Sequence, residues 1–236
     1  MHYLALLGSD LSQDPEPGTP EFDARSAGYN RFGERAAGSI RGGAALLEPG
    51  TAATIRHGDG APLVTDGPFA ETIEAIGGFY VLETDTLDDA IELAREIPCA
   101  SNGWIALRPL VGWYPNADDP AVTGQRFLAM AYGKEATTPG TPEWDEAAVA
   151  HRAFVADAGA AVLGGAALHP TTMATTVQVR DGEVIVTDGS LGEAADVAGC
   201  LYMVQAADRD AAVALAGRIP VPSENAVEVR PVWERG

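Results

Sequence analysis

Val64-Thr65-Asp66-Gly67 returns 122 residues later as Val186-Thr187-Asp188-Gly189, and this recurrence decides the fold. The same offset aligns residues 18–110 with residues 140–232 without a gap, and about a third of the aligned positions are identical, which indicates an internal repeat. A chain of 236 residues has room for two domains of about 110 residues each. We therefore predict two copies of one fold.

Composition excludes several classes of protein. The chain is 46% hydrophobic and 21% charged, which is typical of a soluble globular protein and not of a disordered one. A formal charge of −19 disfavours direct nucleic-acid binding, because phosphate backbones require clustered Lys and Arg. No segment has the length of a membrane span, and the apolar run at residues 4–7 is too short for a signal sequence. We expect a cytoplasmic protein without membrane contact.

Cysteines and histidines give no support for metal or redox chemistry. Cys99 and Cys200 fall at non-equivalent positions of the two copies and have no CxxC spacing. The four histidines lack the spacing of zinc ligands. We expect buried, inert thiols, no metal and no cofactor.

The sequence of each copy predicts the same order of elements along the chain: a strand, a helix, two strands joined by a hairpin turn, a strand, a helix and a closing strand. Thr followed by Pro and an acidic residue starts the first helix in both copies, at Thr19 and Thr141. Asp59-Gly60 and Asp181-Gly182 are predicted hairpin turns. In the first copy we expect the first strand at residues 3–7, the first hairpin strand at 52–56, the next strand at 78–82 and the second helix at 87–97. In the second copy the same four elements are expected at residues 127–132, 175–180, 200–204 and 209–219.

This order is that of a ferredoxin-like sandwich, in which two helices cover one sheet face. The apolar strands do not alternate with polar residues, so both faces of the sheet require cover. The most economical cover for the second face is the other copy, packed sheet against sheet about a pseudo-twofold axis. We predict an α+β fold with residues 1–112 as the first copy, residues 113–125 as a linker and residues 126–236 as the second, diverged copy.

Two stretches of the first copy carry a family resemblance: VTDGPFAETIEAIGGFYVLE at residues 64–83 and GWIALRPL at residues 103–110. They resemble the YCII-related family, in particular its DGPF branch. The second copy, with VTDGSLGEAADVAGCLYMVQ at residues 186–205 and NAVEVRPV at residues 225–232, is similar but diverged. The resemblance covers nearly the whole chain. It implies tandem ferredoxin-like repeats that form an intramolecular dimeric α+β barrel.

The resemblance implies two kinds of function. Some relatives in the wider family look like small-molecule enzymes, including a chloride-eliminating one from aromatic degradation. Other genes of the DGPF type lie beside extracytoplasmic-function sigma factors, which implies a regulatory or accessory role and a link to such a factor. A small-molecule ligand and a homodimer are compatible with both. Family proposals of an active site centre on a His and an Asp near the first helix and the sheet.

Asp66 and Asp188 are site candidates because both copies retain them at a strand end, where a pocket mouth can form. Either carboxylate would act as a base or a substrate anchor, with a pKa raised by partial burial. The alternative is a turn in which the carboxylate accepts hydrogen bonds from nearby backbone amides.

Glu71 and Glu193 lie five residues beyond these aspartates. They either pair with the aspartate across the pocket or form ion pairs with Arg108 and Arg230, and the ion pairs are the preferred interpretation.

His151 is the candidate general acid or base, because the ordinary pKa of histidine lies near physiological pH. Tyr29 takes the equivalent place in the first copy and is a poor base near neutral pH. The second copy also replaces Phe69 by leucine. The two pockets are therefore unequal: either the second copy acts through His151 and Asp188, or the first keeps the Phe69 loop as a binding site.

Two functions stay open. The first is a non-catalytic small-molecule-binding or regulatory protein. The second is a cofactor-independent enzyme of lyase or isomerase type that uses His151 and Asp188 as a catalytic pair.

Overall fold

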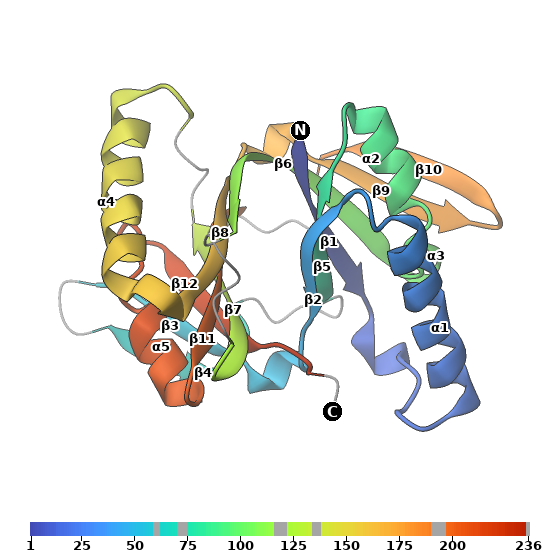
Figure 1. The fold of residues 1–236 in the computed structure, drawn as a ribbon, viewed down its shortest axis with the longest axis horizontal. Helices are drawn as coiled ribbons and strands as arrows, with labels where there is room; N and C mark the ends of the chain where they lie inside the picture. The colour runs from blue at the N-terminus through green and yellow to red at the C-terminus, as the bar shows by residue number, and fades with distance from the viewer. Residues whose placement is uncertain (59–61, 70–74, 116–121, 134–137, 190–196, 235–236) are drawn as a thin grey trace. The chain divides into compact units, whose positions relative to one another are not determined.

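A computed structural model describes residues 1–58, 62–69, 75–115, 122–133, 138–189 and 197–234 (Figure 1). The chain forms two compact units that interleave along the sequence. Unit 1 consists of Met1–Ala45, Thr72–Pro109 and Thr171–Gly192, and unit 2 consists of Leu46–Glu71, Leu110–Pro170 and Glu193–Gly236. Each unit therefore contains most of one copy together with a hairpin from the other copy.

Unit 1 is built on an open antiparallel sheet with the strand order β2-β5-β1-β6-β9-β10. Its strands are β1 (His2–Ser9), β2 (Ile40–Ala45), β5 (Ala75–Glu83), the first half of β6 (Trp104–Pro115), β9 (Thr175–Arg180) and β10 (Glu183–Asp188). Its helices are α1 (Pro20–Arg35), α2 (Leu87–Ala94) and the short α3 (Cys99–Asn102). The pair β9–β10 comes from the second copy.

Unit 2 repeats this plan with the order β8-β11-β7-β12-β3-β4, and the second half of β6 adds to β8 at its edge. Its strands are β3 (Ala53–Arg56), β4 (Leu63–Asp66), β7 (Gln125–Gly133), β8 (Val162–Leu168), β11 (Val197–Ala206) and β12 (Ala226–Pro231). Its helices are α4 (Pro142–Ala158) and α5 (Arg209–Ala216). Here the pair β3–β4 comes from the first copy.

The α+β class is confirmed, but each copy contains a strand that the sequence did not predict, β2 in the first copy and β8 in the second. The exchange of hairpins is a finding that the sequence did not predict, because a local pattern specifies a hairpin but not the strand edge that it joins. The predicted linker also starts too early, since β6 continues through Pro115. No helix among the described residues is long and apolar enough to span a membrane.

Helix starts follow the predicted capping chemistry. The side chains of Thr19 and Thr141 accept hydrogen bonds from the backbone N–H groups three residues on, and proline occupies the next position in both helices. The second helix of each copy ends at Ala94 and Ala216, three residues before the predicted end. Beyond these residues the chain continues in tighter turns, with bonds from Ile97 N–H to the Ala94 carbonyl and from Ile219 N–H to the Ala216 carbonyl.

The turn Asp181-Gly182 has φ values of 52° and 83°, the positive pair that a type I′ hairpin requires, so this prediction is confirmed. The corresponding turn Asp59-Gly60 lies outside the described residues.

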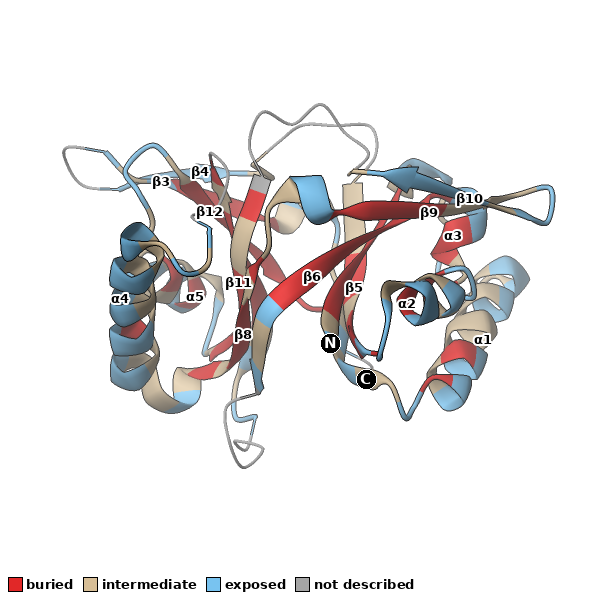
Figure 2. Ribbon diagram, turned by 90° about the horizontal axis from the view of Figure 1, so that it is seen from above, coloured by how far each residue is buried: buried red, intermediate tan, exposed pale blue. Residues whose placement is uncertain are grey.

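The central strands of each sheet are buried on both faces, whereas β4 and β10 at the sheet edges are exposed (Figure 2). In unit 1 Ala5 and Val177 of the sheet pack with Phe32 of α1, and in unit 2 Ile55 of the sheet packs with Phe154 of α4. The opposite faces are also closed to solvent. Their buried residues include Leu4, Leu6, Phe79 and Val81 in unit 1 and Leu128, Met130, Leu201 and Met203 in unit 2. Burial on both faces is what non-alternating apolar strands predict.

In one cross-strand pair the small and the large residue exchange strands between the two copies. Gly8 faces Trp104 between β1 and β6, and a Cβ atom on Gly8 would lie 2.0 Å from the Trp104 ring. At the matching place between β7 and β12, Tyr132 faces Ala226. The large residue of the pair thus lies on β6 in the first copy and on β7 in the second.

Candidate functional site

The Asp-Gly phrase forms a fixed loop at the end of β4 in unit 2. Gly67 has a φ of 98°, a conformation that glycine adopts at little cost. Its N–H donates to the carbonyl of Ala52 at 2.9 Å, and its own carbonyl accepts a hydrogen bond from the Thr54 hydroxyl at 3.0 Å. Gly189 in unit 1 makes the equivalent bonds, at 2.8 Å each, to Ala174 and Thr176. In both units the recurring phrase therefore extends the pairing between the two strands of the exchanged hairpin.

Asp66 lies on the outside of this loop. Its side chain is 87% exposed and forms an ion pair with Arg209 at the start of α5, with 2.6 Å between Oδ1 and Nη2. Arg209 also donates to the carbonyl of Ala52 at 2.9 Å. Asp188 is likewise exposed at the end of β10. The burial expected for a catalytic carboxylate is therefore absent at both positions, and the ion pair of Asp66 holds the hairpin against α5.

Phe69 connects the loop to the interior of unit 2. Its backbone N–H donates to Oε2 of Glu228 at 2.9 Å. Its ring stacks on Tyr132 with 4.9 Å between centroids and 4° between planes, and the Arg56 guanidinium lies 4.9 Å from the Phe69 ring centroid. We call Phe69, Tyr132, Glu228 and Arg230 the loop cluster.

Glu228 and Arg230 form a buried ion pair on β12. Their side chains are 7% and 5% exposed, and Oε1 of Glu228 lies 2.5 Å from Nη2 and 3.0 Å from Nε of Arg230. Two charges this far from water are tolerated only as a pair with further hydrogen bonds. Burial raises the pKa of Tyr132 and Glu228 adds to the effect, while Arg230 opposes it, so the phenol stays protonated.

Sequence reasoning missed Glu228 and Tyr132. Glu228 interrupts the apolar closing strand of the second copy, where the first copy has Ala106. The signal in the sequence was a charged residue inside an otherwise apolar strand. An alignment of the two copies finds the residues that both share, and Glu228 is present in only one.

His151 lies on α4 and contacts Tyr202 of β11. Its Nδ1 is 2.7 Å from the Tyr202 hydroxyl, and the two rings are nearly parallel with centroids 6.0 Å apart. Burial lowers the pKa of His151 and raises the pKa of Tyr202, so both groups are neutral near pH 7. A neutral imidazole with one nitrogen held in this way is able to accept a proton.

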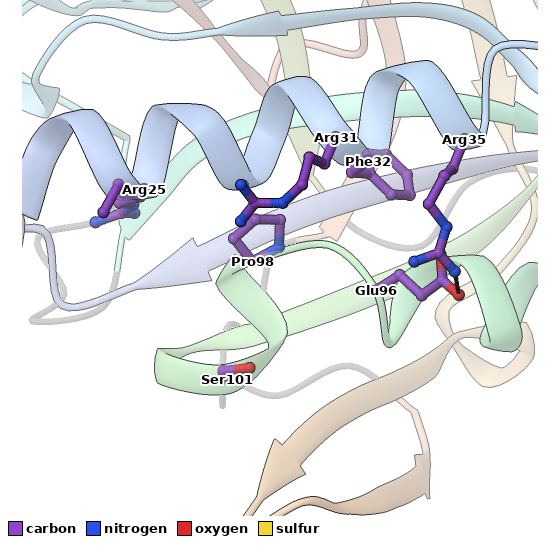
Figure 3. Close-up of a pocket in the computed structure, with 9 residues that line it drawn as sticks. Arg25, Arg31, Phe32, Arg35, Glu96, Pro98 and Ser101 are labelled. Atoms are coloured by element: carbon purple, nitrogen blue, oxygen red, sulfur yellow. Dashed lines mark hydrogen bonds and ion pairs between the residues drawn. The ribbon is translucent and has the colours of Figure 1, made fainter.

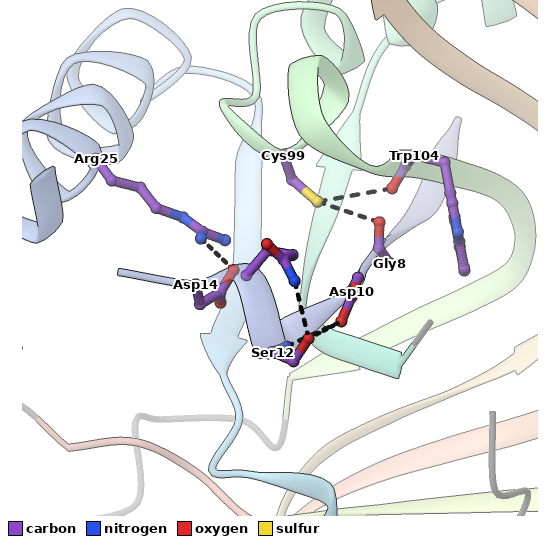
Figure 4. A network of polar contacts seen from close by, with 8 residues as sticks. Gly8, Asp10, Ser12, Asp14, Arg25, Cys99 and Trp104 are labelled. Atoms are coloured by element: carbon purple, nitrogen blue, oxygen red, sulfur yellow. Dashed lines mark hydrogen bonds and ion pairs between the residues drawn. The ribbon is translucent and has the colours of Figure 1, made fainter. Parts of the chain in front are cut away.

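Tyr29 takes the corresponding place in unit 1. Burial raises its pKa, with a smaller contribution from Cys99, so the phenol does not act as a base at neutral pH. The thiol of Cys99 lies 3.4 Å from the carbonyl of Gly8 and 3.8 Å from that of Trp104 (Figure 4). Burial raises the pKa of Cys99 to about 11 and that of Cys200 to about 12, which fits the inert thiols that the sequence predicts.

The predicted site residues divide between the units. Asp66 and Phe69 share one loop of unit 2, and His151 belongs to the same unit, whereas Tyr29 and Asp188 belong to unit 1. The His151–Asp188 pair therefore stays a prediction. Glu71 and Glu193 lie outside the described residues, so their ion pairs with Arg108 and Arg230 also stay predictions. No group of three or more His, Cys, Asp or Glu side chains in the described part of the chain is placed to hold a metal ion.

The fold and the two repeated hairpin loops define a tandem-repeat α+β protein with antiparallel sheets. The profile of the YCII-related domain matches residues 20–114 and again residues 125–235, and the chain therefore belongs to the YCII-related family. This confirms the resemblance and the presence of two tandem copies. The chain is also similar to an uncharacterized protein of Rhizobium meliloti (strain 1021), at 42% identity over 81 residues. The match covers 34% of the chain and 65% of that relative.

Proposed function

We propose that the protein is a non-catalytic, cytoplasmic small-molecule-binding protein of the DGPF branch, with a regulatory or accessory role, and that the loop cluster of unit 2 is its binding centre. The observation that carries the proposal is the buried Glu228–Arg230 pair, which holds the Phe69 amide at the end of the loop. A buried charge pair contributes little net stability, so its presence favours a role in recognition.

The loop cluster offers groups suited to a small polar ligand. The Tyr132 hydroxyl keeps its proton, and the Phe69 ring gives an aromatic surface. The first copy has Ala106 in place of Glu228, so we assign binding to unit 2 alone. We further propose that the two sheets pair as a dimeric α+β barrel, which is supported by the burial of the sheet faces away from the helices.

A thermal-shift screen of metabolites tests this function, because a ligand that binds only the native protein raises its melting temperature. We expect hits on the wild type whose shift disappears in Glu228→Gln and in Phe69→Leu, the residue of the second copy. Leu63→Val, at an exposed site on the same hairpin, should keep the shift and serves as the control. A ligand that stabilises all four proteins equally would place binding elsewhere.

The second candidate is a cofactor-independent lyase or isomerase. It is favoured by one observation, the neutral His151 with its Nδ1 2.7 Å from the Tyr202 hydroxyl. His151→Ala and Asp188→Asn should each abolish turnover of a substrate found by screening while the protein stays folded. Turnover that survives both substitutions would remove this assignment.

The regulatory role includes the proposed link to an extracytoplasmic-function sigma factor and a homodimer. Purification of the tagged protein from its own cells should recover the sigma factor, and sedimentation should give twice the mass of 24.5 kDa. Recovery of the protein alone as a monomer would contradict both.

A further inference from the structure

A groove of about 330 Å³ lies in unit 1 between α1 and the segment that follows α2 (Figure 3). Arg25, Arg31 and Arg35 line it from α1, and Glu96 and Pro98 line the other side. The helix approaches Pro98 closely at Gly28, where a Cβ atom would lie 3.2 Å from the proline ring. The absence of a side chain at Gly28 therefore lets α1 pack against Pro98 within the groove.

These arginines stand out in an acidic protein. They are three of only 15 basic residues in a chain with a formal charge of −19. Asp14 pairs with Arg25 and Glu96 pairs with Arg35, while Arg31 makes no ion pair with another residue that the structure describes. A guanidinium carries five N–H donors in a planar fork, so even the paired arginines keep donors for a ligand.

The second copy is an internal control for this groove. Where the first copy has Arg25 and Arg31, the second has Ala147 and Ala153 on α4. The third position keeps an ion pair with reversed charges, because Asp157 pairs with Arg218 where Arg35 pairs with Glu96. The fold thus retains the ion pair but does not require Arg25 and Arg31.

The spacing of the arginines indicates the form of the ligand. At 1.5 Å of rise per residue, Arg31 and Arg35 are about 6 Å apart along the helix axis, and Arg25 and Arg35 are about 15 Å apart. Forked donors at these intervals suit several oxyanion groups on one elongated molecule, since arginine binds phosphate through two parallel hydrogen bonds. We propose that the α1 groove binds an elongated small molecule that carries phosphate groups. The proposal is independent of the loop cluster.

Calorimetric titration of the full chain with inorganic triphosphate at low ionic strength tests the groove. We expect saturable binding that weakens with added salt, because exposed charges are screened. Arg31→Ala should weaken binding by about tenfold or more, as expected for the loss of hydrogen bonds to a charged group. Arg152→Ala removes an exposed arginine from α4 and should change the affinity less than about twofold, which makes it the matched control.

Two further variants keep the test decisive if Arg31→Ala lowers stability. Arg31→Glu reverses the charge at an exposed position and should abolish binding, whereas Arg31→Lys keeps the charge without the fork and should give an intermediate affinity. Circular dichroism melts confirm that each variant is folded. Equal affinities of Arg31→Glu and Arg152→Ala, or no saturable binding to the wild type at millimolar triphosphate, would overturn the proposal.

Discussion

At the scale of single residues, the duplicated chain separates what the fold requires from what one copy has added. Thr54 and Thr176 make the same bond to the glycine of the recurring phrase, so this contact belongs to the fold. Glu228, in contrast, has alanine as its counterpart. Recurrence therefore predicted the loop that carries Asp66 and Phe69, and it failed for the partner that the loop contacts, because the partner is where the copies differ.

The pair Gly8 and Trp104 gives the first prediction. Gly8→Ala places a methyl group against the indole ring and should lower the free energy of unfolding by about 1–3 kcal/mol, as overpacking of a core does. In a Trp104→Ala background the same change should cost almost nothing, since the space is then open. Urea unfolding of the four proteins of this double-mutant cycle measures the coupling. An equal loss of free energy of unfolding in both backgrounds would show that the Trp104 ring does not cause the effect of Gly8→Ala.

His151 gives a prediction about pH. Burial lowers its pKa below the ordinary value of 6.5, so the unfolded chain binds a proton more readily than the native protein. The native state should therefore be most stable above pH 6.5 and lose stability as the pH falls below it. His151→Gln removes this contribution, so the loss between about pH 7.5 and about pH 5.5 should be smaller in the variant, as measured by urea midpoints. An identical loss would show that His151 does not titrate in this range.

At the scale of elements, the sequence predicted each hairpin but not the sheet edge that the hairpin joins. An Asp-Gly turn is a local signal, whereas the sheet edge that a hairpin joins is decided by contacts between residues distant in sequence. Arg180 is one of these contacts: from the second copy, it donates to the carbonyls of Ala100 and Gly103 of the first copy at 3.0 and 2.8 Å. Arg209 makes a comparable contact to β4 in unit 2. An anchoring arginine of this kind has no recognisable sequence pattern.

The β9–β10 hairpin gives a prediction at this scale. Gly182 has a φ of 83°, and no atom lies within 4 Å of the place that an alanine Cβ would take, so Gly182→Ala adds backbone strain without a clash. We expect a loss of about 1 kcal/mol in the free energy of unfolding and faster amide exchange in β10. Gly33→Ala is the control, because Gly33 lies within α1 in open space, and alanine there should stabilise by about 0.5–1 kcal/mol. A stabilising Gly182→Ala would contradict the type I′ turn.

At the scale of the whole molecule, the exchanged hairpins tie the stability of each copy to that of the other. Val177 of the second copy packs in the core of unit 1, and Ile55 of the first copy packs in the core of unit 2. Neither core is complete without residues from both copies. The domain boundaries predicted at residues 112 and 126 follow the repeat, whereas the compact units cross them. Similarity between the two copies shows which residues were duplicated. It does not show which segments of the chain pack together in one unit.

This arrangement predicts that the chain unfolds in one cooperative transition although it contains two units. Calorimetry should give equal calorimetric and van't Hoff enthalpies. Ile55→Ala and Val177→Ala each remove a fully buried side chain, and Ile55→Ala should cost about 2–5 kcal/mol. Because both units depend on both copies, each substitution should shift the single transition to lower temperature without dividing it. Two resolved transitions, of which Ile55→Ala lowers only the one assigned to unit 2, would mean that each unit folds without the stability of the other.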